Sequence, residues 1–368
     1  MASRPRLFPL FAVATLTAAT LFTGACGTDD NGPARSAKRP EAADEPASTG
    51  PVTCAEATIT GAGSTFVQTL AQQWVKDYGA ECAGATINYQ GVGSGAGVQQ
   101  FLSGTVDFAG SDAVLKPEEE TGAGAVLHIP WAAGGIAVLY HLSGVDDLKL
   151  GPTTLAGIFA GTITTWDDAA IASENKGASL PAKPIQVVHR SDGSGTTKVF
   201  TSYLTAVAPS VWTAGADKDV PWPTGQGAKG SDGVSAAVQQ ADGAIGYAEY
   251  SFAEANGVTV ASIGNEAGAY VKPTAKAVSA ALREAEVPAD LKIKVTYKPE
   301  DKAAYPISTT TWAIVHTDTS DPAKAKLLKG FLLYAVGKGQ AAATGLFYAP
   351  LPQEIAVRAQ AAVYQLKG

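Results

Sequence analysis

Three segments of the chain share one arrangement, in which a glycine-containing loop is followed by a Ser or Thr and then by an amphipathic helical pattern. Each would offer free backbone N–H groups, the positive end of a helix dipole and a hydroxyl at the capping position, a combination that binds anions. One such loop alone is more often an ordinary helix cap, because Ser and Thr cap helices widely. Three of them favour an anion site. The loops span residues 61–66, 91–97 and 190–196.

The third loop adds two charged residues. Arg190 carries a guanidinium whose fixed fork of donors fits a tetrahedral oxyanion, and Asp192 follows two residues later. In the alternative interpretation, Arg190 is a surface charge and Asp192 an Asx-turn residue. The loops do not predict nucleotide binding, because those at Gly61 and Gly91 lack the full dinucleotide fingerprint and Lys198 is misplaced for a P-loop.

Short apolar, β-rich runs alternate with helical patterns along the chain, which predicts an α/β fold. The chain has 368 residues and 46% apolar content, which suggests about two domains. The clearest helix begins near Phe66, where apolar residues recur on one face up to Tyr78. Further helices are predicted over 322–336 and 353–366. The predicted strands are 57–60, 86–90, 106–109, 136–140, 185–189, 244–247 and 312–316.

The composition argues against some partners. The formal net charge is −7, so the chain lacks the basic field that gathers nucleic acid, and no nucleic-acid partner is expected. Local dipoles would have to hold an anionic ligand. The four histidines, His128, His141, His189 and His316, show no metal-ligand spacing, so neither a metal nor another cofactor is predicted.

The N-terminus predicts export. Two arginines precede an apolar run over 7–21 that leads to Thr-Gly-Ala-Cys at Cys26. This resembles the bacterial lipoprotein signal, so we expect a signal peptide over 1–26, lipid on Cys26, and anchoring of the exported protein to the outer face of the cell membrane. An ordinary signal cleaved nearby, or an uncleaved anchor, is the alternative. Residues 27–56 have few large apolar side chains and are expected to form a flexible tether.

Two cysteines remain once Cys26 is assigned to lipid. Cys54 lies just before the first predicted strand, and Cys82 lies at the end of the first predicted helix. An exported protein meets an oxidising compartment, so a disulfide between them is expected. Two buried free thiols are the alternative that the sequence leaves open.

Seven segments agree in order with one known family: 60–66 (Thr-Gly-Ala-Gly-Ser-Thr-Phe), 88–95, 106–112, 164–168, 190–196, 243–247 and 305–309. In these segments the chain resembles the PstS family, the phosphate-binding proteins of bacterial high-affinity phosphate ABC transporters. The resemblance runs from about residue 57 to the C-terminus. It implies a two-lobed, type II-like periplasmic-binding-protein fold with two crossings, near 135–140 and 305–312. Lobe I would combine 57–135 with 310–368, and lobe II would be 136–309.

The resemblance also implies a binding protein and not an enzyme. Such a protein, expected as a monomer, closes on dehydrated inorganic phosphate and delivers it to the membrane permease subunits of an ABC transporter. Asp192 would hold Arg190 in place. The implied ligands are Thr65 and Phe66 through their backbone N–H groups, together with Ser94, Asp112, Arg190, Ser194, Gly195 and Thr196.

Asp112 has a chemical rationale beside phosphate, although an Asp after a Ser is commonly a plain turn or cap residue. Phosphate at neutral pH carries at least one O–H, which a carboxylate can accept. Fully ionised sulfate offers no proton and meets only charge repulsion. The sequence therefore predicts selectivity for phosphate over sulfate through Asp112.

Three other functions compete with this interpretation. Ser194 with His189 and Asp192 would suggest a phosphatase-type hydrolase, but no Gly-x-Ser-x-Gly elbow surrounds the serine. A receptor for another oxyanion is the second, and arsenate resembles phosphate too closely to be separated from it by sequence. A tethered adhesin or signalling protein is the third, and it would need no site at Arg190.

Overall fold

A computed structural model describes residues 52–368. The predicted signal peptide, Cys26 and the predicted tether up to residue 51 lie outside the described residues. Residues 52–56 form no helix or strand, but they are attached to the folded part. Cys54 is disulfide-bonded to Cys82, and the carbonyl of Thr53 accepts a hydrogen bond of 2.7 Å from the hydroxyl of Tyr78. None of the helices within 52–368 is long and apolar enough to cross a bilayer.

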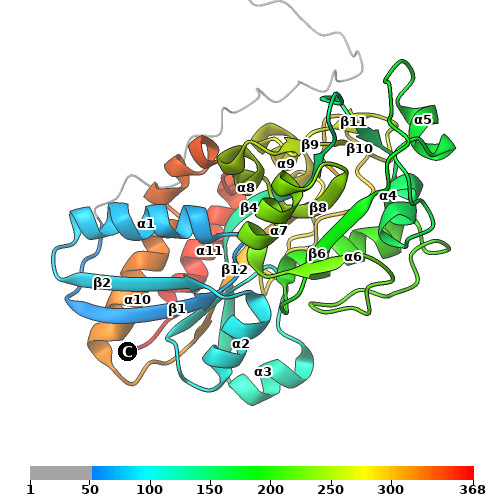
Figure 1. Cartoon of the computed structure of the whole chain (residues 1–368). Helices are drawn as coiled ribbons and strands as arrows, with labels where there is room; N and C mark the ends of the chain where they lie inside the picture. The colour runs from blue at the N-terminus through cyan, green and yellow to red at the C-terminus, as the bar shows by residue number, and fades with distance from the viewer. Residues whose placement is uncertain (1–51) are drawn as a thin grey trace, which may run out of the picture. The chain divides into compact units, whose positions relative to one another are not determined.

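A nine-stranded mixed sheet runs through the molecule (Figure 1) in the order β2-β1-β3-β12-β4-β8-β6-β7, with β9 paired to β4. Strands β1, β2 and β3 are parallel, whereas β12 is antiparallel to both β3 and β4. These strands form what we call the first half of the sheet. Their bounds are β1 Ala57–Gly63, β2 Ala85–Gly91, β3 Phe108–Ser111, β4 Val126–His141 and β12 Ser308–His316.

Strand β4 continues from the first half of the sheet into a second half. It pairs with β12 up to Gly135 and with β8 from Ile136 onward. The return crossing lies beside it, because the N–H of Ile136 donates to the carbonyl of Ile307 over 2.9 Å and the hydroxyl of Tyr305 donates to the carbonyl of Ile136 over 2.7 Å. The chain therefore passes between the halves at two adjacent places, near the crossings that were predicted.

The second half of the sheet begins at the C-terminal part of β4. Strand β8 is antiparallel to β4, and β6 is parallel to both β8 and β7. A separate three-stranded sheet has the order β11-β10-β5. The bounds are β5 Lys149–Leu150, β6 Gln186–Arg190, β7 Gln226–Ala228, β8 Ala244–Glu249, β9 Thr259–Val260, β10 Ser262–Gly264 and β11 Tyr270–Val271.

Helices cover the sheet (Figure 1). Helix α1 shows why these helices form. Leu70, Trp74 and Tyr78 are spaced four residues apart, so they lie on one face of the helix, and all three are fully buried. The indole of Trp74 also donates to the carbonyl of Gly339 over 2.8 Å. The helices are α1 Gln68–Glu81, α2 Ser94–Leu102, α3 Pro117–Ala123, α4 Pro152–Phe159, α5 Ala169–Glu174, α6 Gly195–Val207, α7 Gly230–Gln240, α8 Tyr250–Asn256, α9 Ala275–Leu282, α10 Pro322–Ala335 and α11 Gln353–Tyr364, with 3₁₀ turns at Lys338–Ala342 and Thr344–Leu346.

All seven predicted strands exist, but their bounds differ from the prediction, and β12 begins four residues before the predicted 312. Strand β3 begins two residues later than predicted. Strand β4 begins ten residues earlier than the predicted 136. The prediction missed this first part because it contains Pro130, and proline rarely occurs inside a strand. The sheet accommodates this proline at a bulge, where the register with β12 shifts between Thr311 and Trp312.

Candidate functional site

Asp112 lies at the point where several candidate residues converge. It follows β3 in the first half of the sheet and is 2% exposed. One carboxylate oxygen, Oδ1, accepts hydrogen bonds from the hydroxyls of Ser64 (2.5 Å) and Thr311 (2.9 Å). The other, Oδ2, accepts one of 3.2 Å from the hydroxyl of Thr196, which belongs to helix α6 next to the second half of the sheet. The carboxyl thus joins three separate segments.

The protonation of Asp112 is shifted by its surroundings. Burial raises the pKa of the carboxyl above its ordinary value, although hydrogen bonds from Ser64, Thr311 and Thr196 and the charge of Arg190 act in the opposite direction. The surrounding hydroxyls hold this carboxyl in one orientation, so it can accept a hydrogen bond only from a donor placed in a particular direction. It is suited to a ligand that brings its own O–H.

Arg190 and Asp192 form a two-pronged ion pair at the end of β6. The guanidinium donates through Nε (2.7 Å) and Nη2 (2.5 Å) to the two carboxylate oxygens. The N–H of Gly230 donates to the same carboxylate over 3.0 Å. Burial raises the pKa of Asp192, but the hydrogen bonds and charge of Arg190 outweigh it and hold the value below the ordinary one. The carboxylate of Asp192 therefore holds the guanidinium of the buried Arg190 side chain in one orientation.

The loop 190–196 leads directly into helix α6. Ser194 is its N-cap, since its hydroxyl accepts a 3.1 Å hydrogen bond from the N–H of Thr197. At Gly195 the two halves of the site approach each other closely. A Cβ at this position would lie 2.6 Å from the hydroxyl oxygen of Ser94 and 2.8 Å from the backbone nitrogen of Asp112. Only glycine fits this approach without displacement of its neighbours.

The loop 91–97 faces the loop 190–196. Gly93 has φ +91°, a conformation that favours glycine, and helix α2 begins at the next residue. The N–H of Gly95 donates to the carbonyl of Gly193 over 2.8 Å. Ser94 is buried, and its hydroxyl accepts a long hydrogen bond (3.4 Å) from the N–H of Asp112. Ser94, Asp112 and the start of α6 are therefore immediate neighbours.

The first loop contributes a further contact between the halves. The hydroxyls of Thr65 and Ser231 lie 3.0 Å apart, and the N–H of Ser231 donates to the Thr65 hydroxyl over 3.2 Å. The N–H of Phe66 donates to the hydroxyl of Ser64 (3.0 Å), and its carbonyl accepts from the hydroxyl of Tyr348 (2.6 Å). Both predicted residues of this loop are buried.

The expected cap positions were wrong for two of the three loops. The residue before helix α1 is Val67 and the one before α2 is Gly93, and neither cap is made by a side chain. Thr65 is directed toward Ser231 instead, and Ser94 is already within the first turn of its helix. Of the three helices, only α6 has the predicted hydroxyl cap.

Three hydroxyl residues of the site were missed by sequence reasoning: Ser64, Ser231 and Thr311. A signal for Thr311 was present. It ends a run of four consecutive hydroxyl residues from Ser308, all buried within strand β12. A run of buried polar groups in a central strand is unusual and indicates a function for them. Ser231 had no comparable signal, because its contact with Thr65 spans 166 residues.

The residues of the competing hydrolase interpretation make other contacts. The ring of His189 stacks on Trp222 with centroids 4.7 Å apart, and its Nδ1 lies 3.0 Å from the carbonyl of Arg190. No hydrogen bond joins His189 to Ser194 within 52–368. In the same residues, no group of three or more His, Cys, Asp or Glu side chains is placed to hold a metal ion.

The arrangement is chemically suited to an oxyanion. It combines a fixed guanidinium, the N-termini of α2 and α6, several buried hydroxyls and one carboxyl acceptor. Hydroxyls can donate or accept as the ligand requires. The fold and these features define the class as a solute-binding protein with its site between two halves.

Comparison with known proteins gives the family. A family model described as a PBP superfamily domain matches residues 44–338. The phosphate-binding protein PstS of Pasteurella multocida is 40% identical over 83% of this chain and 89% of its own length. Phosphate-binding protein PstS3 of Mycobacterium bovis is 36% identical over 96% of this chain and 97% of its own. The chain belongs to the PstS family of phosphate-binding proteins within the PBP superfamily.

A solved structure supports the same fold. The high-affinity periplasmic phosphate-binding protein PfluDING, bound with phosphate, is similar with a TM-score of 0.70 and 29% identity, over 83% of this chain and 93% of that one. A phosphate-binding protein from Stenotrophomonas maltophilia, at 23% identity and a TM-score of 0.65, has the same fold. The predicted α/β, two-lobed periplasmic-binding-protein fold is confirmed.

Proposed function

We propose that this chain captures inorganic phosphate between its two lobes and delivers it to the permease subunits of an ABC transporter for import. The names of its relatives support this ligand. The observation that carries the proposal is the buried Asp112 carboxyl, which lies among hydroxyls from both halves of the sheet and within the electrostatic influence of Arg190. The chain acts as a binding protein and not as an enzyme.

The proposed ligands come from both halves of the sheet. Asp112 accepts the phosphate O–H, and the guanidinium of Arg190, fixed by Asp192, donates to the phosphate oxygens. The start of α6 supplies further donors. The remaining proposed ligands are Thr65 and Phe66 through backbone N–H, Ser94, Ser194, Gly195 and Thr196.

We assign lobe I to 57–135 with 310–368 and lobe II to 136–309. Three contacts between these segments support a closed arrangement. They join Thr196 to Asp112, Thr65 to Ser231, and Gly95 to the carbonyl of Gly193. Phosphate stabilises this arrangement because its ligands come from both lobes.

Calorimetric titration of the purified protein with phosphate, sulfate and arsenate tests the proposal. We expect tight binding of phosphate and exclusion of sulfate. Small-angle scattering of the same samples should give a smaller radius of gyration with phosphate than without it. Absence of phosphate binding, or phosphate hydrolase activity on model esters, would contradict the proposal.

The mode of anchoring is a separate part of the proposal. We propose that the protein is a monomer, exported and held at the outer face of the cell membrane by lipid on Cys26. The apolar run ending in Thr-Gly-Ala-Cys supports this. Cys26→Ala should abolish labelling by a radioactive fatty-acid precursor and release the protein from membranes. A variant that stays membrane-bound would show that something else anchors it.

A further inference from the structure

Helix α3 and the residue before it make three ion pairs with distant parts of the chain. Lys116 pairs with Asp217 at 2.8 Å. Glu119 pairs with Lys218 at 3.4 Å. Glu120 pairs with Lys292 at 2.5 Å. Residues 116–120 follow β3 and Asp112, on the first half of the sheet, whereas the partners lie within 136–309. The three pairs therefore connect the same two parts of the chain as the site does.

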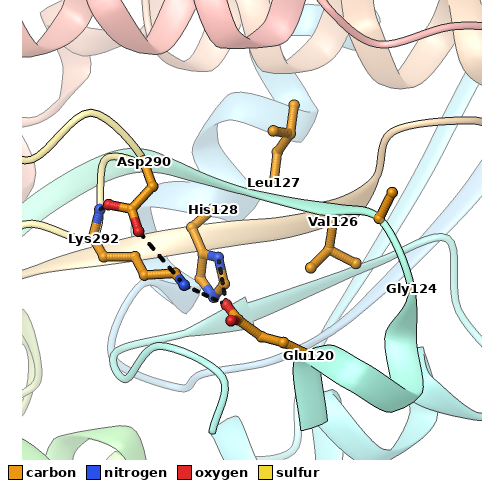
Figure 2. A pocket seen from close by; sticks show the side chains of 8 residues that line it. Glu120, Gly124, Val126, Leu127, His128, Asp290 and Lys292 are labelled. Carbon is orange, nitrogen blue, oxygen red and sulfur yellow. Dashed lines mark hydrogen bonds and ion pairs between the residues drawn. The ribbon is translucent and has the colours of Figure 1, made fainter. Parts of the chain in front are cut away.

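The Glu120–Lys292 pair has two further charged or titratable neighbours, His128 and Asp290, which Figure 2 shows. The carboxylate of Glu120 contacts both Lys292 and the ring of His128, whose Nδ1 lies 3.7 Å from it. Asp290 also contacts Lys292, at 3.6 Å. The Nε2 atom of His128 accepts a 3.1 Å hydrogen bond from the N–H of Leu115. The histidine is thus fixed on the segment that leads from Asp112 to α3.

The middle pair is much less exposed than the first one. The side chains of Lys218 and Glu119 are 11% and 16% exposed, compared with 46% and 40% for Lys116 and Asp217. Salt and water screen an exposed pair, so it contributes little to stability. A shielded ammonium that loses its partner is strongly unfavourable. The Glu119–Lys218 pair should therefore dominate the three.

Lys218 is also connected directly to the site. Its backbone carbonyl accepts a 2.8 Å hydrogen bond from the N–H of Ser194, the cap residue of α6. One turn later, the ammonium of Lys198 donates to the carbonyl of Ala216 over 2.7 Å. The segment carrying Lys218 is thus hydrogen-bonded to the start of α6 at two places. On the other side, residues 113–115 connect Asp112 to the segment of Glu119.

We propose that residues 116–120, together with Asp217, Lys218 and Lys292, form an electrostatic latch that holds the lobes closed over the ligand, with Lys218 as a positioning residue for the start of α6. This inference rests on the proposed phosphate function. The latch raises the apparent affinity by increasing the closed fraction, without touching phosphate itself. It acts mainly on the dissociation rate, since phosphate leaves after the lobes open.

Glu119→Gln tests the latch. The glutamine keeps an acceptor for the N–H of Lys116, which Glu119 now binds at 2.8 Å, so the start of α3 should remain intact. It removes the charge that faces Lys218. Glu118→Gln is the matched control, because Glu118 lies in the same helical turn, is exposed and makes no ion pair among the described residues.

Stopped-flow measurement of phosphate dissociation gives the readout. In Glu119→Gln we expect the dissociation rate to rise on the order of tenfold, because the shielded Lys218 ammonium loses its partner. The rate in Glu118→Gln should equal that of the wild type. Raising the salt concentration to about 0.5 M should accelerate dissociation in the wild type more than in Glu119→Gln.

A double-mutant cycle separates the pair from general damage. Lys218→Met alone should also accelerate dissociation, and Glu119→Gln combined with Lys218→Met should accelerate it by less than the product of the two single effects. Fully multiplicative effects, an unchanged rate in Glu119→Gln, or an equal change in Glu118→Gln would overturn the latch while wild-type binding stands. A wild type that binds no phosphate would overturn the latch and the proposed function together.

Discussion

The site around Asp112 and the latch around helix α3 join the same parts of the chain by different means. At the site, buried hydroxyls donate to one carboxyl, and the residues involved are at most 3% exposed. At the latch, opposite charges pair at side-chain exposures between 11% and 46%. Hydrogen bonds at the site depend on direction and should determine which ligand is accepted. Ion pairs depend on charge and screening and should determine how long the lobes stay closed.

The largest effect is expected at the site. Arg190→Ala should weaken phosphate binding on the order of a hundredfold or more, because a charge-assisted hydrogen bond is worth roughly 1.5–3 kcal/mol and at least two are lost. Arg190→Lys should lose less, since it keeps the charge but not the fork. Titration calorimetry measures both. Arg283→Ala, which removes an exposed arginine paired with Asp301, is the control and should bind normally.

The second prediction concerns how the unfolding free energy depends on pH through His128, which contacts Glu120 of the latch. Burial lowers the pKa of His128 to about 4 from an ordinary 6.5, so the folded protein keeps this ring neutral where the unfolded chain protonates it. The unfolding free energy should therefore fall as the pH drops from 6.5 toward 4. Between pH 7 and pH 5 the loss due to His128 should be on the order of 2 kcal/mol.

His128→Gln should remove this part of the pH dependence, since glutamine keeps an acceptor for the N–H of Leu115 but does not titrate. Urea unfolding of both proteins at several pH values measures the difference. An equal loss of stability in the variant between pH 7 and pH 5 would assign the effect to other groups.

The third prediction tests the source of selectivity. In Asp112→Asn, the hydroxyls of Ser64 and Thr311 should hold the amide oxygen, leaving the NH₂ on the side of Thr196. Phosphate then loses its acceptor, whereas sulfate gains a donor and no longer meets a negative charge. The phosphate-to-sulfate affinity ratio should fall on the order of tenfold or more, because phosphate binding weakens and sulfate binding tightens. Equal exclusion of sulfate in the variant would show that the other hydrogen bonds discriminate.

The smallest effect is expected at the exposed edge of the latch. Lys116→Met breaks the pair with Asp217, whose two side chains are nearly half exposed. Exposed pairs contribute about 0–1 kcal/mol, so phosphate dissociation should accelerate by less than about fivefold. A larger effect than that of Glu119→Gln, measured in the same stopped-flow series, would invert the ranking of the pairs.

The sequence predicted the loops of the site better than their partners. Arg190, Ser194 and Asp192 are close in sequence, so a single loop together with the family resemblance was enough to nominate them. Thr311 donates to Asp112 although the two residues are 199 positions apart in the sequence, and no local pattern predicts a contact between such distant positions. Contacts of this length depend on how the two halves of the sheet pack.

The fold shows the same limit. Amphipathic periodicity predicted helix α1 and the C-terminal helices to within a few residues, because burial of one face decides their position. The first part of β4 was not predicted, since Pro130 and the glycine pair at Gly134 and Gly135 are locally typical of loops. Pairing with β12 on one side overrides that preference. Tertiary pairing, and not local propensity, produces the strand that connects the halves.

The disulfide between Cys54 and Cys82 has a mechanical consequence. It attaches the segment at Cys54, just before β1, to the end of helix α1, and the hydrogen bond from the Tyr78 hydroxyl to the Thr53 carbonyl reinforces that attachment. Helix α1 contacts β2 in the first half of the sheet. A pulling force applied to the chain before Val52 is therefore transmitted first to helix α1 and to the strands on which it packs. The disulfide makes helix α1 the mechanical attachment point at this end of the described chain.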